Sequence, residues 1–158
     1  MRGKKREKRL IEPDLQYGSV IVTKFINQIM HSGKKEIARR VMHEALQKIS
    51  SDEKQKNDPL EIFESAIKNV SPELEVRSRR IGGANYQVPM PVPQDRKITL
   101  AMRWIISAAK NKKGKSMAEK LAEEFILASK NEGAAIKKKS DTQRMAEANK
   151  AFAHFARY

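Results

Sequence analysis

Three arginines in one short segment have the right chemistry to bind phosphate groups. Arg77, Arg79 and Arg80 occur within four consecutive positions and are followed by Gly82 and Gly83. The planar guanidinium group can donate two parallel hydrogen bonds to a phosphate and can stack on a flat ring, so arginine is better suited than lysine to bind nucleic acid. This segment is therefore the first candidate for a binding site.

An aromatic side chain follows the two glycines. Tyr86 offers a flat ring on which an unpaired base could stack. The same ring is equally well suited to pack across paired strands, against Val76 or Arg80. The sequence leaves both roles open.

Basic residues gather in five clusters along the chain. The sequence has 33 lysine and arginine residues against 19 aspartate and glutamate residues, a formal net charge of +14. Because a surface adapted only for solubility mixes both signs, this segregation predicts a face that binds a polyanion. The cations assigned to this face are Arg2, Lys4, Lys5, Arg6, Lys8 and Arg9; Lys34 and Lys35; Arg77, Arg79 and Arg80; Arg96, Lys97 and Arg103; and, from the run Lys110 to Lys115, Lys112, Lys113 and Lys115.

The sequence contains no recognisable catalytic or metal-binding arrangement. It has no cysteine, and His31, His43 and His154 lie too far apart to form a metal-ligand motif. The Gly82-Gly83 pair belongs to neither of the glycine-rich motifs that bind nucleotides. We therefore expect no enzyme activity, no metal, no cofactor and no small-molecule substrate, and we expect surface or interface roles for the histidines.

The same totals favour nucleic acid over an anionic membrane as the partner. No apolar run approaches the ~18 residues needed to span a bilayer. The basic stretch at the N-terminus has no apolar segment behind it, so it does not resemble a secretory signal. The lack of cysteine fits a reducing compartment. We expect an intracellular protein with no membrane partner.

Hydrophobic residues at helical spacing predict helices on both sides of the arginine-rich segment. Val20 and Ile37 are expected to face the core from the first two helices, and Gly33 is expected to end the first. The predicted fold is a single, mainly α domain: a bundle of about six helices with a protruding two-stranded β-ribbon. Its predicted parts are a basic extended arm over residues 1–18, three helices over 19–70, the ribbon over 72–92, two helices over 95–130, and a last helix and tail over 134–158.

Capping residues predict where three of the helices begin. Asp58 is followed by Pro59, a combination typical of the first turn of a helix. Ser116 is followed three residues later by Glu119, which is the pattern of a capping box. The segment Ser140–Gln143 is expected to cap the last helix.

Alternating polarity predicts the ribbon. One strand alternates Leu74, Val76 and Ser78 with Glu75, Arg77 and Arg79, and the other alternates Tyr86, Val88, Met90 and Val92 with Gln87, Pro89 and Pro91. A turn with positive φ is expected over 82–85. Because Pro89, Pro91 and Pro93 lack a backbone N–H on one edge, that edge cannot pair with a further strand. The ribbon is therefore expected to stand alone, supported by helices at its base.

Four segments resemble the bacterial-type family of small-subunit ribosomal protein seven. They are GKKEIARRVMHEAL, DPLEIFESAIKNVSPELEVRSRRIGGANYQVPMPV, LAMRWIISAAK and DTQRMAEANKAFAHF. They follow one another in the order and at the spacing of the family, so the resemblance covers almost the whole chain. The arm over residues 1–9 is its least diagnostic part, and the tail ending in FARY is slightly longer than in the shortest bacterial members.

The resemblance implies a ribosomal role. Members of this family are helical bundles with a protruding β-ribbon, bind the 3′ major domain of small-subunit ribosomal RNA, and nucleate assembly of the subunit head. Their ribbon reaches toward the transfer RNA exit site, beside other head and platform proteins. By position, the five basic clusters should face ribosomal RNA. The residues expected nearest to transfer RNA are Gly82, Gly83, Ala84, Asn85, Tyr86 and Arg144.

The resemblance further implies a structural constituent of the ribosome. It does not separate a bacterial cytoplasm from an organelle of bacterial descent, but the N-terminal segment does not resemble a transit extension, which favours the bacterial cytoplasm. Whether the protein also represses translation of its own messenger RNA stays open at this point. Two rival functions are compatible with a basic helical protein. A helix-turn-helix regulator would use the first two helices and depend on a duplex operator. A protein-binding adaptor would bind its partner independently of salt.

Overall fold

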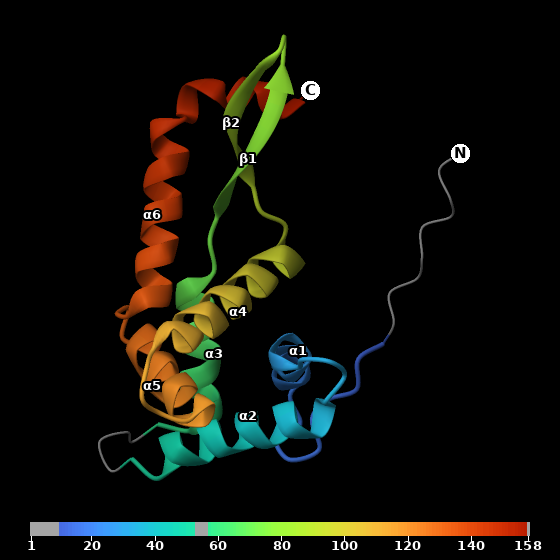
Figure 1. The fold of residues 1–158 in the computed structure, drawn as a ribbon, viewed down its shortest axis with the longest axis vertical. Coiled ribbons are helices and arrows are strands. Elements are labelled where there is room, and N and C mark those ends of the chain that lie inside the picture. The colour runs from blue at the N-terminus through green and yellow to red at the C-terminus, as the bar shows by residue number, and fades with distance from the viewer. Residues whose placement is uncertain (1–9, 53–56, 158) are drawn as a thin grey trace.

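The computed structural model describes residues 10–52 and 57–157, and in this part of the chain the fold is mainly α-helical with one two-stranded antiparallel sheet. Figure 1 shows a bundle of helices from which the ribbon projects, with α6 running beside the ribbon. The predicted fold class is therefore confirmed. The elements are α1 (Val20–Ile29), α2 (Lys35–Ser50), α3 (Pro59–Val70), β1 (Leu74–Ile81), β2 (Ala84–Pro91), α4 (Gln94–Asn111), α5 (Met117–Ser129), α6 (Ala134–Ala148) and the 3₁₀ helix η1 (Lys150–Arg157).

Three phenylalanines hold the centre of the bundle. Phe25, Phe63 and Phe125 come from α1, α3 and α5 and are fully buried. Their ring centroids lie 5.1–5.4 Å apart, and two of the three pairs are edge-to-face. Such pairs contribute about 0.5–1.5 kcal/mol each beyond the area they bury. The helical spacing of apolar residues thus becomes one contiguous core around this cluster.

Two predicted helix starts are confirmed by their caps. The Asp58 carboxylate accepts a hydrogen bond from the Leu60 N–H at 3.2 Å, and α3 begins at Pro59. The Ser116 hydroxyl accepts a hydrogen bond from the Glu119 N–H at 3.3 Å, at the start of α5. These local signals could be recognised because donor and acceptor are close in sequence.

Two predicted helix ends were wrong. The first helix ends at Ile29 and not at Gly33, because the chain leaves the helical conformation at Met30 and crosses to α2 through Ser32 and Gly33, both with positive φ. The last helix begins at Ala134, so Ser140 lies inside it and caps nothing.

A buried glutamate explains where α6 begins. Glu124 in α5 has no exposed surface, and its Oε1 accepts a hydrogen bond from the Ala135 N–H at 3.0 Å. Its Oε2 lies 3.0 Å from Lys112 Nζ. The carboxylate therefore binds the positive end of α6 and is itself charge-compensated. Gly133 is needed beside it, because a Cβ there would lie 2.9 Å from Glu124 Oε1.

Some residues predicted to be buried are exposed, and some predicted to lie in an unpacked arm are buried. Val20 and Ile37 are exposed, 39% and 54% respectively, rather than facing the core. The predicted arm over 1–18 is wrong from residue 14 onward. Asp14 is buried, with Oδ2 3.0 Å from His43 Nε2, and Tyr17 packs edge-on against the same imidazole. Burial and then the Asp14 carboxylate raise the pKa of Tyr17.

The turn of the ribbon is shorter than predicted. Ile81 pairs with Ala84, so the turn consists of Gly82 and Gly83 alone, and Ala84 and Asn85 belong to β2. Both glycines have positive φ, 56° and 87°, which is the requirement of the tight hairpin turn that matches strand twist.

The outward direction of the prolines agrees with the prediction. Val92 N–H donates to the Glu73 carbonyl at 3.0 Å, so the residue at 92 points its nitrogen toward the partner strand. Because this direction alternates along a strand, Pro91 and Pro89 point theirs toward the outer edge of β2. That edge offers no N–H at these two positions to a further strand.

The ribbon is supported well beyond its base, contrary to the prediction. Helix α6 contacts β1, and η1 packs against β2 and crosses behind the ribbon in Figure 1. The Tyr86 ring lies 5.3 Å from Phe152 and 5.1 Å from Phe155, centroid to centroid. Neither predicted neighbour lies opposite Tyr86, because Val76 pairs with Pro89 and Arg80 pairs with Asn85.

The contact between Gly133 and Glu124 makes a stability prediction. Gly133→Ala should destabilise the fold by roughly 2–4 kcal/mol, because it adds a clash with a buried carboxylate to the strain of a positive φ. Gly114→Ala is the matched control: φ is also positive, 82°, but no atom lies within 4 Å of the added carbon. It should cost only about 1–2 kcal/mol of strain. Urea unfolding followed by circular dichroism measures both, and equal losses would contradict the role given to Glu124.

Candidate nucleic-acid interface

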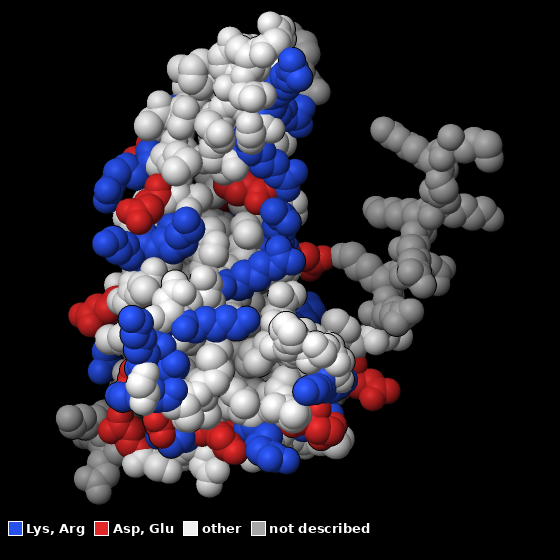
Figure 2. Space-filling view, viewed as in Figure 1, with Lys and Arg blue, Asp and Glu red and all other residues white. Residues whose placement is uncertain are grey.

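A row of cations runs along one face of α4. Arg96, Arg103 and Lys110 are spaced seven residues apart, and seven residues make nearly two helical turns, so the three side chains lie on the same face. Arg103 and Lys110 are exposed, and Arg96 is half-buried. The row begins where β2 ends and leads to the lysine-rich loop after α4. Figure 2 shows basic atoms continuing from the edge of the ribbon across the helices below it.

The ribbon carries arginines on both of its faces. Side chains alternate along a strand, so Arg77 and Arg79 share one face and Arg80 lies on the other. The pairing register places Arg79 opposite Tyr86 and Arg80 opposite Asn85. The Tyr86 ring is half-buried and already contacts Phe152 and Phe155 of η1. The ribbon can therefore offer phosphate donors in two directions.

An acidic residue lies among these arginines. Glu75 in β1 is only 8% exposed, although the alternation had placed it on the polar side of the strand. Its Oε2 accepts a hydrogen bond from Arg96 Nε at 2.8 Å, and its Oε1 is bonded by Arg77 through Nε and Nη2. The carboxylate thus joins the ribbon to α4. Sequence patterns do not predict this contact, because Arg96 is 21 positions away from Glu75.

Two of the predicted cations are bound within the protein. Lys112 Nζ lies 3.0 Å from Glu124 Oε2, and Lys115 is hydrogen-bonded to Glu123. This hydrogen bond raises the pKa of Lys115 and lowers the pKa of Glu123. Lys113 is exposed and makes no ion pair with any other described residue. It is therefore the loop residue best placed to meet an external anion.

Lys34 and Lys35 lie at the beginning of α2, far from the ribbon. Figure 1 places α2 at the end of the bundle opposite to the ribbon tip. Both side chains are exposed at the positive end of a helix, where a cation is unfavourable, and Glu36 offsets them only in part. Their position costs stability, which favours a role with an external anion.

The residues predicted to approach transfer RNA are not gathered at one point. Gly82 and Gly83 form the exposed tip of the ribbon. Arg144 is exposed on α6, with its Nη1 3.9 Å from Asp141 Oδ1, and the ribbon tip extends beyond α6 in Figure 1. The remaining predicted cations, Arg2, Lys4, Lys5, Arg6, Lys8 and Arg9, lie outside the described residues.

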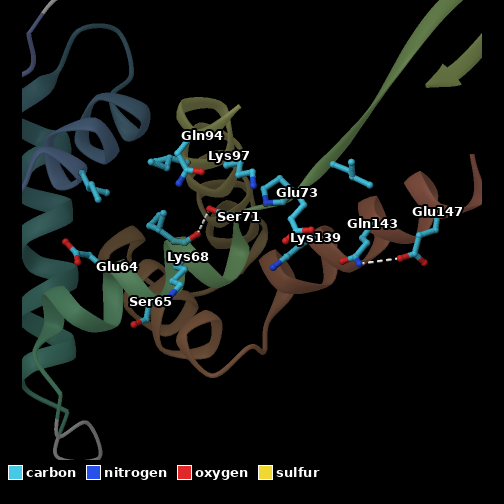
Figure 3. Close-up of a pocket in the computed structure, with 15 residues that line it drawn as sticks. Glu64, Ser65, Lys68, Ser71, Glu73, Gln94, Lys97, Lys139, Gln143 and Glu147 are labelled. Carbon is cyan, nitrogen blue, oxygen red and sulfur yellow. Dashed lines mark hydrogen bonds between the residues drawn. The ribbon is translucent and has the colours of Figure 1, made fainter. Parts of the chain in front are cut away.

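A hollow beside the base of the ribbon does not have the charge of a nucleic-acid groove. A space of about 820 Å³ lies between α3, the base of β1, α4 and α6 (Figure 3). One of its lysines, Lys139, is already bound, because its Nζ donates to the Asn69 carbonyl at 2.7 Å. The charged residues of the lining, three of each sign, are Glu64, Lys68, Glu73, Lys97, Lys139 and Glu147. The raised row of cations, and not this hollow, therefore fits a polyanion.

The described residues contain no group of three or more histidine, cysteine, aspartate or glutamate side chains that could hold a metal ion. Over the same ranges, no helix is both long enough and apolar enough to cross a membrane.

Comparison with known proteins places the chain among ribosomal proteins. Residues 1–150 match the family model described as ribosomal protein S7p/S5e. The protein named small ribosomal subunit protein uS7 from Thermotoga maritima is 56% identical over 155 residues, covering 98% of this chain and 99% of the relative. Proteins of the same name are 54% identical in Protochlamydia amoebophila, over 94% of each chain, and 53% identical in Treponema denticola, over 98% and 97%.

The row on α4 predicts a difference between two single-charge changes. Arg103→Gln should weaken binding to structured RNA and reduce the slope of log K against log salt by about one, because one phosphate contact is lost. Lys48→Gln removes the same charge from a lysine that is bound to Glu119 Oε1 at 3.0 Å, away from the row. It should leave the slope nearly unchanged. Equal effects in filter binding at several salt concentrations would show that only net charge matters.

Proposed function

Because the chain belongs to the ribosomal protein S7p/S5e family, we propose that it is a structural constituent of the small ribosomal subunit that binds ribosomal RNA directly. The observation that carries the proposal is the family match, which extends over residues 1–150. The row on α4 and the ribbon arginines supply the surface for it. The prediction that the chain is no enzyme is confirmed by its family, whose members are structural components.

The length of the basic surface supports a role in assembly. Cations lie at the beginning of α2, along α4 and on the ribbon, which are well separated in Figure 1. A folded protein that contacts RNA at distant points fixes the relative orientation of the RNA segments that it touches. The proposed target is the 3′ major domain of small-subunit ribosomal RNA, and the proposed consequence is nucleation of the subunit head in the bacterial cytoplasm.

The shape of the ribbon supports a second contact. Its tip consists of two glycines without side chains, so the backbone can approach another molecule closely. The proposed neighbour is transfer RNA in the exit site, which Arg144 approaches from α6, and head and platform proteins are the proposed neighbours elsewhere on the surface. Repression of the protein's own messenger RNA has no observation in its favour.

Family membership also decides between the rival functions. A helix-turn-helix regulator would concentrate its basic residues on one recognition helix, whereas in the described chain α2, α4 and α6 carry four each and β1 carries three more. A salt-independent protein adaptor would leave this surface without a role.

The proposed function predicts specific, salt-sensitive binding. With about six phosphate contacts, affinity for a transcript of the 3′ major domain should fall roughly a thousandfold between 50 and 200 mM salt. At every salt concentration that transcript should bind more tightly than duplex DNA or unrelated RNA of equal length. Filter binding with the full chain measures all three. The same affinity for all three would reduce the protein to a non-specific cation and refute the ribosomal role.

The division of the ribbon into base and tip makes a separate prediction. Removing the two cross-strand pairs Arg80–Asn85 and Ile81–Ala84 shortens the ribbon while keeping the turn glycines and the Tyr86 contacts. The shortened protein loses only one arginine, Arg80. Its affinity for the 3′ major domain should therefore equal that of the matched control, Arg80→Gln. Subunits reconstituted with the shortened protein should bind exit-site transfer RNA more weakly than those with the control. Failure of the shortened protein to enter subunits would contradict this division.

A further inference from the structure

Glu75 has an unusual environment for a surface strand of a basic protein. Its carboxylate is buried and is bonded on one oxygen by Arg77 of the same strand and on the other by Arg96 of α4. Figure 2 shows acidic atoms next to basic ones where the ribbon meets the helices. A carboxylate at this point repels an approaching polyanion. Glu75 must therefore contribute something that offsets this repulsion.

The two arginines are held from one side and open on the other. The side chains of Arg77 and Arg96 remain 49% and 42% exposed although both are bonded to Glu75. Arg96 uses its Nε–H for this bond at 2.8 Å, which leaves the four N–H groups of its two Nη atoms. Arg77 likewise keeps the N–H groups of Nη1. Since both bonds end on a single carboxylate, the two guanidinium groups are neighbours.

We propose that Arg77 and Arg96 form one binding site for a single phosphate of the RNA backbone, with Glu75 as the residue that positions both guanidinium groups. The inference rests on the proposed function, since it assigns a specific phosphate site within that interface. A free arginine side chain loses rotational freedom when it binds, and a carboxylate that already fixes its orientation lowers this cost. The ligand is a phosphodiester group, and its recognition does not depend on the base.

Whether Glu75→Gln strengthens or weakens RNA binding shows whether Glu75 positions the arginines or only contributes charge. Glu75→Gln removes a negative charge from the interface, so a purely electrostatic interface would bind RNA more tightly. If Glu75 positions the arginines, affinity for the 3′ major domain should instead fall about three- to tenfold, roughly the contribution of one well-placed phosphate contact. Glu73→Gln is the matched control, because Glu73 is exposed in the same segment and should leave affinity unchanged or slightly higher.

A second pair of variants makes the test independent of the folding of Glu75→Gln. Arg96→Lys keeps the charge but replaces the directional Nε–H with a flexible ammonium group. If geometry matters, Arg96→Lys should weaken RNA binding nearly as much as Arg96→Gln; if only charge matters, it should bind like the wild type. In the Arg96→Gln background, Glu75→Gln should cause no further loss, whereas in the Arg103→Gln background it should cause its full loss.

The outcomes separate the two proposals. Tighter binding by Glu75→Gln in a variant with wild-type unfolding in urea, or wild-type affinity for Arg96→Lys, would overturn the phosphate site while leaving ribosomal RNA binding intact. Equal affinity of the wild type for ribosomal and unrelated RNA would refute the proposed function itself. The expected losses, confined to the backgrounds that retain Arg96, would establish the site.

Discussion

A two-stranded ribbon buries too little surface to be stable by itself, and the arrangement of this molecule depends on how its ribbon is held. Val88 is fully buried and its neighbour Pro89 is also buried, so the ribbon is covered on both faces at this point. The rings of Tyr86, Phe152 and Phe155 attach β2 to η1. The chain thus returns after α6 to support a strand that left the bundle about sixty residues earlier.

Net positive charge sets a second constraint, because a chain of net charge +14 repels itself when it is compact. Two buried acidic residues oppose this repulsion inside the molecule. Glu75 links β1 to α4, and Glu124 links α5 to the beginning of α6 and to Lys112. Each of these carboxylates joins elements that are separate in the sequence. Glu75 and Glu124 therefore form ion pairs inside the molecule, whereas cations such as Arg103 and Lys113 are exposed.

What could be predicted from the sequence was local. Apolar spacing gave the core helices, alternation and the Gly82-Gly83 pair gave the ribbon, and Asp58 gave the start of α3. Three contacts that were missed share another cause: Glu124 binding the start of α6, Glu75 binding Arg96 and Asp14 binding His43 join polar groups 11–29 positions apart. Hydrophobic periodicity does not register a buried carboxylate, since its partner is specified only by the folded chain. The basic clusters were found because charge needs no fold to be counted.

The contacts of Glu75 with Arg77 and Arg96 hold the ribbon against α4 and also form the proposed phosphate site. The side chains of Arg77 and Arg96 both contact Glu75 and both remain about half exposed. A phosphate can therefore bind without displacing the carboxylate. Because a ligand that binds only the folded arrangement stabilises it, RNA bound here strengthens the junction between β1 and α4. A ribbon fixed at this junction and along η1 has a defined direction, so the position of its glycine tip is determined by contacts made far below it.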